Sequence, residues 1–96
     1  LRGLEVPAFQ DTYGWIEYRR GNFTEALANL EPAAAGLPKD PFVQLHLGLT
    51  YAALNRPEEA RATLTRALEI AGETGKADLP AFAEARAALE KLPPGN

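Results

Sequence analysis

A step of 34 residues recurs along this chain and limits its possible folds more than any other feature. Eight pairs of identical residues lie 34 positions apart, with no insertion between them. They are Pro7 and Pro41, Gln10 and Gln44, Gly14 and Gly48, Glu25 and Glu59, Ala26 and Ala60, Ala28 and Ala62, Leu30 and Leu64, and Ala33 and Ala67. A period of this length is typical of solenoids, in which each unit buries its apolar face by stacking on the next.

The punctuation by Gly, Asn and Pro predicts five helices and no strand, because no segment alternates with period two. The expected helices cover residues 7–20, 23–31, 41–54, 57–71 and 80–92. Pro32 is expected to kink or end the second helix near Glu31, since proline removes a backbone donor and clashes with the preceding turn. Gly72 and Gly75 are expected to stop the fourth helix in the left-handed conformation.

Capping signals support two of these helix starts. Asn22 is a favourable N-cap residue, and Glu25 stands three residues later in the register of a capping box. Asp40 followed by Pro41 is a strong start signal for the third helix.

The last predicted helix, residues 80–92, has the amphipathic pattern of a helix that covers the end of a repeat stack. Its inward residues are Phe82, Ala85, Leu89 and Leu92, and its outward residues are Glu84, Arg86, Glu90 and Lys91.

These residues resemble the tetratricopeptide repeat, a helix–turn–helix unit of 34 residues. The second unit matches the pattern of that family at Leu47, Gly48, Tyr51, Ala60 and Leu64, and the first matches it at Tyr13, Gly14, Ala26, Leu30 and Pro38. The small residues at positions 14, 26, 48 and 60 would let paired helices approach closely. The sequence departs from the pattern at Gln10, Gln44, Glu17 and Gly72, and at Phe82, which falls where a third unit would place its Gly.

The resemblance implies an all-α fold, an α-solenoid of antiparallel helix pairs within one domain over residues 1–96. The first repeat would cover residues 7–40, the second residues 41–74, and a capping helix with a tail residues 75–96. In this family the first helix of each unit lines a concave groove. That mapping places the candidate partner-binding groove at Trp15, Tyr18, Arg19, Phe42, Leu45, His46 and Leu49, with Asp11 and Thr12 on the same side. Trp15, Tyr18, Phe42, Leu45 and Leu49 are then expected to be partly exposed and contiguous.

Composition excludes several classes of function. The chain has no Cys, no Ser and a single His, His46, so no catalytic residue, metal site or cofactor is predicted, and we expect no enzyme. The net charge is −3 with scattered basic residues, which argues against nucleic acid as a partner. No stretch is long and apolar enough for membrane insertion.

The predicted function is a non-catalytic scaffold that binds a partner peptide or helix in the groove. The alternative is a structural or self-associating segment of a larger repeat protein, including a homo-oligomer, in which the same apolar residues cover a neighbouring repeat or a second copy. The chain opens at Leu1 rather than Met, so we interpret it as a fragment of a longer protein. Its Ala-rich, Pro-punctuated sequence resembles bacterial repeat proteins. The compartment is left open between cytoplasm and periplasm.

Overall fold

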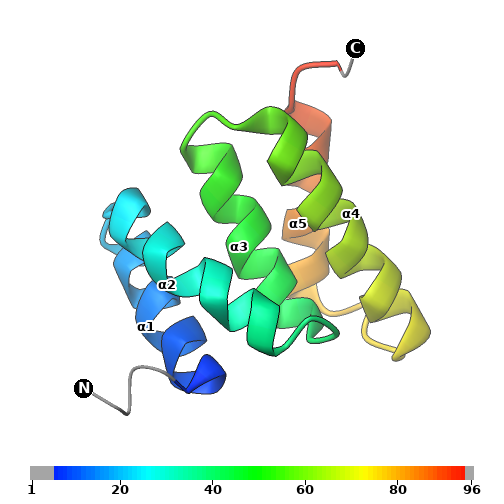
Figure 1. Cartoon of the computed structure of the whole chain (residues 1–96). Helices are drawn as coiled ribbons and strands as arrows, with labels where there is room; N and C mark the ends of the chain where they lie inside the picture. Colours follow the sequence, from blue (N-terminus) through cyan, green and yellow to red (C-terminus); the bar gives the residue numbers. More distant parts are fainter. Residues whose placement is uncertain (1–5, 95–96) are drawn as a thin grey trace.

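The computed structural model describes residues 6–94, which form five α-helices and no strand. The helices follow one another as consecutive antiparallel neighbours, with α1 behind α2 and α5 behind α3 and α4 in the view of Figure 1. Their bounds are α1 Pro7–Arg19, α2 Phe23–Gly36, α3 Pro41–Ala53, α4 Pro57–Glu73 and α5 Pro80–Lys91. The predicted all-α fold is confirmed.

Helix starts follow the proline signals. Proline opens α1, α3, α4 and α5, where its missing N–H would have had no partner in the helix. Asp40 caps α3 as predicted, because its Oδ1 accepts hydrogen bonds from the backbone N–H of Phe42 at 2.9 Å and of Val43 at 3.3 Å. The capping box predicted for α2 is wrong. Asn22 occupies the N-cap position, but its side-chain amide donates to Glu17 Oε1 at 2.7 Å instead of capping the helix.

Three helices end in the same way. The residue after the C-cap has positive φ in each case, at Gly21 (83°), Asn55 (59°) and Gly75 (74°). The next N–H then donates to a carbonyl five residues earlier, at 2.8 Å for Asn22 to Glu17, 2.9 Å for Arg56 to Tyr51 and 2.7 Å for Lys76 to Ala71. This pattern is the Schellman motif. Its recurrence at positions 21 and 55 repeats the 34-residue step in the backbone itself.

Two predicted boundaries are wrong. The second helix passes through Pro32 and continues to Gly36, so the early end near Glu31, one of the two expected effects of the proline, does not occur. Pro32 has no N–H to donate to the carbonyl of Ala28, and Ala28 is exposed to solvent. Ala33, which follows the proline, is fully buried. The packing of the residues after Pro32 therefore holds the helix together. The fourth helix continues to Glu73 with Gly72 inside it, and Gly75 alone supplies the left-handed stop.

Close approach through glycine joins each helix pair. A Cβ atom on Gly14 would lie 2.7 Å from Leu30 Cγ, and one on Gly48 would lie 2.6 Å from Leu64 Cδ2. Glycine at these positions therefore lets α1 lie against α2, and α3 against α4, at a distance that no side chain would permit. Leu30 and Leu64 are both fully buried. The predicted packing role of the two glycines is confirmed.

The third helix is the centre of the molecule. Nine of its thirteen residues are buried. Five of these belong to two apolar clusters, with Val43, Leu47 and Tyr51 in the first and Leu45 and Leu49 in the second. The first cluster joins α3 to α2 and α4 through Ala26, Leu30, Ala33, Ala34, Val43, Leu47, Tyr51 and Ala60. The second joins α3 to α4 and α5 through Leu45, Leu49, Leu64, Ala67, Ala71, Phe82 and Ala85. Helix α3 is therefore covered by α2, α4 and α5.

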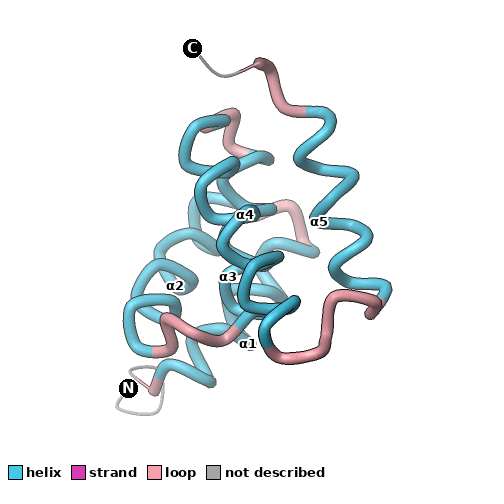
Figure 2. The backbone as a smooth tube through the Cα atoms, turned by 90° about the vertical axis from the view of Figure 1, so that its right-hand side faces the viewer, coloured by secondary structure: helices cyan, strands magenta, loops and turns pink. Residues whose placement is uncertain are grey.

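The helices form a curved stack rather than a flat one. Helix α1 contacts α3 and α3 contacts α5, whereas the backbones of α2 and α4 make no such contact in the part of the chain that is described. The helices that touch successively lie on the inner side of the curve, and α2 and α4 lie on the outer side. Figure 2 shows α5 at one edge of the molecule, beside α4. The chain is thus an all-α repeat solenoid.

A polar contact ties the outer helix α2 to α3. Tyr51 Oη donates to Glu31 Oε2 at 2.6 Å, and the Arg56 guanidinium lies 5.0 Å from the centre of the Tyr51 ring. Burial raises the pKa of Tyr51, and the hydrogen bond to Glu31 raises it further. The folded state therefore holds the phenol proton more tightly than the unfolded chain does.

Stability is expected to fall above about pH 10, the pKa of an unperturbed tyrosine, and less so in Tyr51→Phe. A raised folded-state pKa contributes stability that is complete below the unfolded pKa and is lost as pH rises toward the folded one. Urea unfolding at about pH 8 and about pH 11 measures the loss. Tyr13→Phe is the control, because Tyr13 is 39% exposed. An equal loss of stability in wild type and Tyr51→Phe would show that Tyr51 is not the cause of the pH dependence.

Candidate protein-binding face

The predicted groove residues lie on two neighbouring helices of the inner side. Helix α1 carries Trp15, Tyr18 and Arg19, and α3 carries Phe42, Leu45, His46 and Leu49. Because α1 contacts α3, these two sets lie side by side. The structure therefore brings the set together, although its members differ greatly in exposure.

A row of stacked rings connects α1 to α3. The Trp15 ring stacks on the His46 ring with centroids 4.1 Å apart, and on the Tyr18 ring with centroids 4.6 Å apart. Tyr18 in turn meets Phe23 of α2 at 5.3 Å in a tilted arrangement. All four side chains are half-buried. Trp15 is thus held by rings of its own chain and contributes a fixed, partly exposed aromatic surface.

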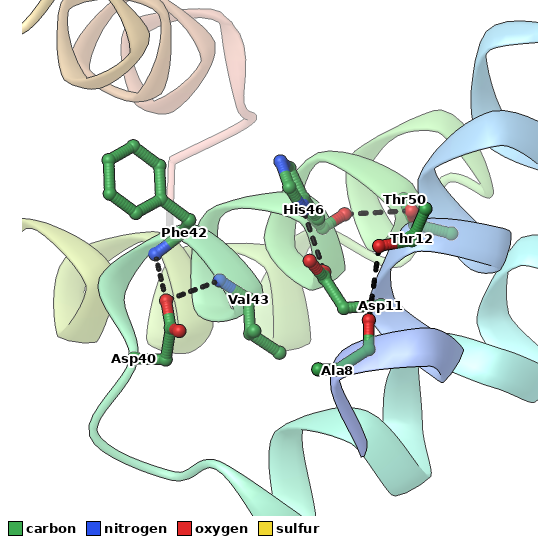
Figure 3. A network of polar contacts seen from close by, with 8 residues as sticks. All are labelled: Ala8, Asp11, Thr12, Asp40, Phe42, Val43, His46 and Thr50. Atoms are coloured by element: carbon green, nitrogen blue, oxygen red, sulfur yellow. Dashed lines mark hydrogen bonds and ion pairs between the residues drawn. The ribbon is translucent and has the colours of Figure 1, made fainter. Parts of the chain in front are cut away.

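A hydrogen bond between two side chains fixes the histidine. His46 Nδ1 lies 2.7 Å from Asp11 Oδ1, and the two side chains are 16% and 18% exposed. Figure 3 shows Asp11 on α1 pointing toward His46 on α3, beside the helix start capped by Asp40. A carboxylate accepts from the N–H of a neutral or protonated imidazole, so this contact sets the ring orientation. Sequence reasoning placed both residues on this side but did not pair them.

Partial exposure was wrongly expected for two residues of the set. Leu45 is 3% exposed and Leu49 is 5% exposed, because α5 lies over this side of α3. Both belong to the cluster that contains Phe82 and Ala85. They are core residues in this structure. Helix α5 occupies the part of the inner side that the mapping assigned to a partner.

Phe42 lies at the edge of the same cluster. Its ring meets Phe82 with centroids 5.2 Å apart and planes inclined by 50°. Its half-buried side chain also lines a hollow of about 650 Å³ between the α2–α3 loop and the α4–α5 loop. The rest of the lining comes from residues 36–41 and from Thr74 and Lys76. This hollow adjoins the predicted set only at Phe42.

Charged side chains surround the aromatic row. Arg19 is exposed at the end of α1. Burial raises the pKa of Tyr18, and the negative charge of Glu84 on α5 raises it further. Glu84 was predicted only as part of an outward polar face, and it is exposed in the structure.

The described residues offer limited chemistry beyond recognition. The Asp11–His46 pair has no Ser or Cys beside it to activate, because the whole chain lacks both. Between residues 6 and 94, no three His, Asp or Glu side chains gather as metal ligands would. Every helix in the same range is too short or too polar to cross a membrane.

Comparison with known protein families shows which family the chain belongs to. The model of the tetratricopeptide repeat matches residues 17–89, which is most of the chain. The chain belongs to the tetratricopeptide repeat family. Domains of this family generally mediate protein–protein interactions and are typically non-catalytic scaffolds. Comparisons with curated proteins and with solved structures gave no match for this tetratricopeptide repeat domain.

Proposed function

We propose that this tetratricopeptide repeat domain binds a peptide or helix of a partner protein on its inner face. The inner face is defined as the partly or fully exposed side chains of Asp11, Trp15, Tyr18, Arg19, Phe42 and His46. The observation that carries the proposal is the curvature: α1, α3 and α5 touch in succession while α2 and α4 do not. A curved stack offers its inner side as an extended binding surface.

The inner face is built to be rigid. Trp15 is stacked between partners from two helices, and His46 is held by Asp11 at 2.7 Å. Side chains that are already ordered lose little entropy on binding, which favours affinity. Aromatic and arginine side chains are also the types that dominate binding energy at protein interfaces. A partner with an apolar side chain for the ring row and an acidic one for Arg19 fits this surface.

Leu45 and Leu49 have no part in this proposal, because α5 buries them. The proposed face is therefore smaller and more polar than the apolar groove expected from the sequence. It has a carboxylate, an imidazole and a guanidinium around its rings. This change shifts the expected partner from a purely apolar helix toward a peptide that combines an apolar anchor with an acidic group.

The second candidate function is a structural or self-associating segment of a larger repeat protein. It is favoured by apolar side chains on α1 that lie apart from the inner face. Phe9 is 57% exposed and Ile16 is 47% exposed. The division into units 7–40, 41–74 and 75–96 belongs to this proposal as well.

Charge reversal on the inner face tests the proposed function. Short peptides are selected from a displayed random library against the wild-type chain, and their affinity for Arg19→Glu is measured by calorimetry. We expect a loss of at least about tenfold, as for an interface arginine. Thr65→Glu on the exposed side of α4 is the matched control and should bind as wild type does. Failure to select any peptide, or equal affinity for both variants, would contradict the proposal.

A further inference from the structure

A hollow apart from the aromatic row lies between two loops. Its volume is about 650 Å³, and it is lined by residues 36–42, from the end of α2 to the start of α3, and by Thr74 and Lys76 of the α4–α5 loop. Both loops lie at the same end of the helix stack (Figure 2). Small-molecule sites typically have volumes of about 300–1,000 Å³. We call this feature the loop hollow, and its volume is that of a site for a small molecule.

The loop hollow lies where the chain departs from its own 34-residue step. Helix α2 ends at Gly36, whereas α4 runs three residues beyond the equivalent position, to Glu73. The loop that follows α4, residues 74–79, has six residues, whereas the α2–α3 loop, residues 37–40, has four. Lys76 belongs to this longer loop. The hollow is therefore a feature of this chain rather than of its repeated unit.

Positive charge gathers at the loop hollow, although the chain has a net charge of −3. Two of the three lysines of the chain, Lys39 and Lys76, are part of its lining. Neither lysine belongs to any of the three ion pairs that form among residues 6–94. The acidic residue of the lining, Asp40, already accepts hydrogen bonds from the backbone N–H groups of Phe42 and Val43. Two lysines and one aspartate leave the lining with one net positive charge, which fits a monoanion.

Much of the remaining lining is apolar. It includes Leu37, Pro38, Pro41 and Phe42. The Phe42 ring is held from behind by Phe82 of α5, with centroids 5.2 Å apart. A ring that is already ordered loses little conformational freedom when an apolar group lies against it. Apolar walls with a few charged groups are the usual composition of a ligand site.

We propose that the loop hollow binds a small organic carboxylate with an apolar body. The carboxylate accepts charge-assisted hydrogen bonds from the ammonium groups of Lys39 and Lys76. The apolar body lies against Pro41 and Phe42. Phe42 alone is shared with the inner face, so this proposal stands whether or not the inner face binds a peptide.

The three lysines allow a direct measurement of binding by NMR. The lysines of the full chain are converted to isotope-labelled dimethyl-lysines, which keep their positive charge, and the chain is titrated with 4-phenylbutyrate. The signals of Lys39 and Lys76 are expected to shift together and to saturate with a Kd of about 1 mM or below. Lys91, at the opposite end of α5, should not move. Equal shifts at all three lysines, shifts centred on Trp15, or no saturation would overturn the proposal.

Removal of one charge tests the role of the lysines. Lys76 is the residue to change, because Lys39 also borders a smaller hollow that is lined by Glu69 and Glu73. In the isotope-labelled chain, the backbone signal of Phe42 reports the affinity for 4-phenylbutyrate. Lys76→Ala is expected to weaken binding at least about tenfold. Lys91→Ala, which removes the same charge elsewhere, should bind as wild type does. Equal affinities of the two variants would overturn the proposal.

A neutral ligand keeps the test decisive if Lys76→Ala fails to fold. The probe is 4-phenylbutyramide, which has the shape of 4-phenylbutyrate without its charge. It is expected to bind the wild-type chain at least about tenfold more weakly than the acid does. Equal affinities of the acid and the amide would contradict a site for a carboxylate.

A protein C terminus is the other source of a carboxylate with an apolar body. An acetylated pentapeptide that ends in phenylalanine is expected to bind no more tightly than 4-phenylbutyrate, because the loop hollow has the volume of a small-molecule site. Binding that is at least about tenfold tighter, and is lost when the C terminus is amidated, would assign the hollow to a chain end. That result would overturn the assignment to a small molecule.

Discussion

Leu45→Glu is expected to unfold the chain. Leu45 is 3% exposed in the cluster with Leu49 and Phe82, so a carboxylate there would be desolvated with no partner. An uncompensated buried charge costs about 3–5 kcal/mol, a large share of the stability of a small domain. Circular dichroism should show loss of the cooperative melt. Ala53→Glu, at an exposed site on the same helix, should melt close to wild type. A folded Leu45→Glu with an unchanged Tm would mean that α5 does not cover this side of α3.

Gly48→Leu is expected to force α3 and α4 apart. Even a Cβ atom there would lie 2.6 Å from Leu64 Cδ2 and 3.2 Å from the Leu64 backbone N, and Leu64 is fully buried. Overpacking of this kind costs about 1–3 kcal/mol or more. The free energy of unfolding in urea measures the effect.

Gly72 provides the matched control for Gly48. It also lies inside a helix, but a Cβ atom on it would meet nothing within 4 Å. Gly72→Leu should therefore leave stability unchanged or raise it by about 0.5–1 kcal/mol, because glycine is a poor helix former. An equal effect of leucine at both positions would refute the role of Gly48 in helix pairing.

The repeat architecture could be predicted because it depends on residues that either determine a helix start by themselves or pack against one repeated partner residue. Gly14 and Gly48 each stand opposite a leucine that is itself repeated, Leu30 and Leu64. Proline and Asp40 mark the helix starts through backbone chemistry that needs no tertiary information. The all-α class therefore follows from the helix signals in the sequence, and the packing role of the two glycines follows from the resemblance to the tetratricopeptide repeat.

The boundary errors arose where tertiary packing outweighs a local signal. Pro32 is a helix breaker in isolation, yet the burial of Ala33 and Ala34 against the α3 cluster carries α2 past it. Asn22 had an acceptable local use as a cap, but the buried Glu17 carboxylate offers its amide a stronger, charge-assisted partner. Neither the packing of Ala33 and Ala34 on α3 nor the hydrogen bond from Asn22 to Glu17 can be inferred from the residues next to Pro32 or Asn22.

The candidate face was misjudged where the repeat ends. Pro41 opens α3 and Pro80 opens α5, a step of 39 positions instead of 34. The period therefore gave no register for α5, and the mapping could not show that Phe82 and Ala85 cover Leu45 and Leu49. The Asp11–His46 pair was missed for another reason. Both residues were placed on the correct side, but a pairing between two helices depends on their axial shift.

Chemical-shift mapping tests the central claim, that a partner binds the inner face of the curved stack, most directly. The isotope-labelled chain is titrated with a library-selected peptide, and the shifted signals are assigned to residues. The indole N–H of Trp15, the ring of His46 and the backbone near Arg19 are predicted to shift together and to saturate at one affinity. Shifts confined to the exposed sides of α2 and α4, with Trp15 and His46 unmoved, would contradict the claim.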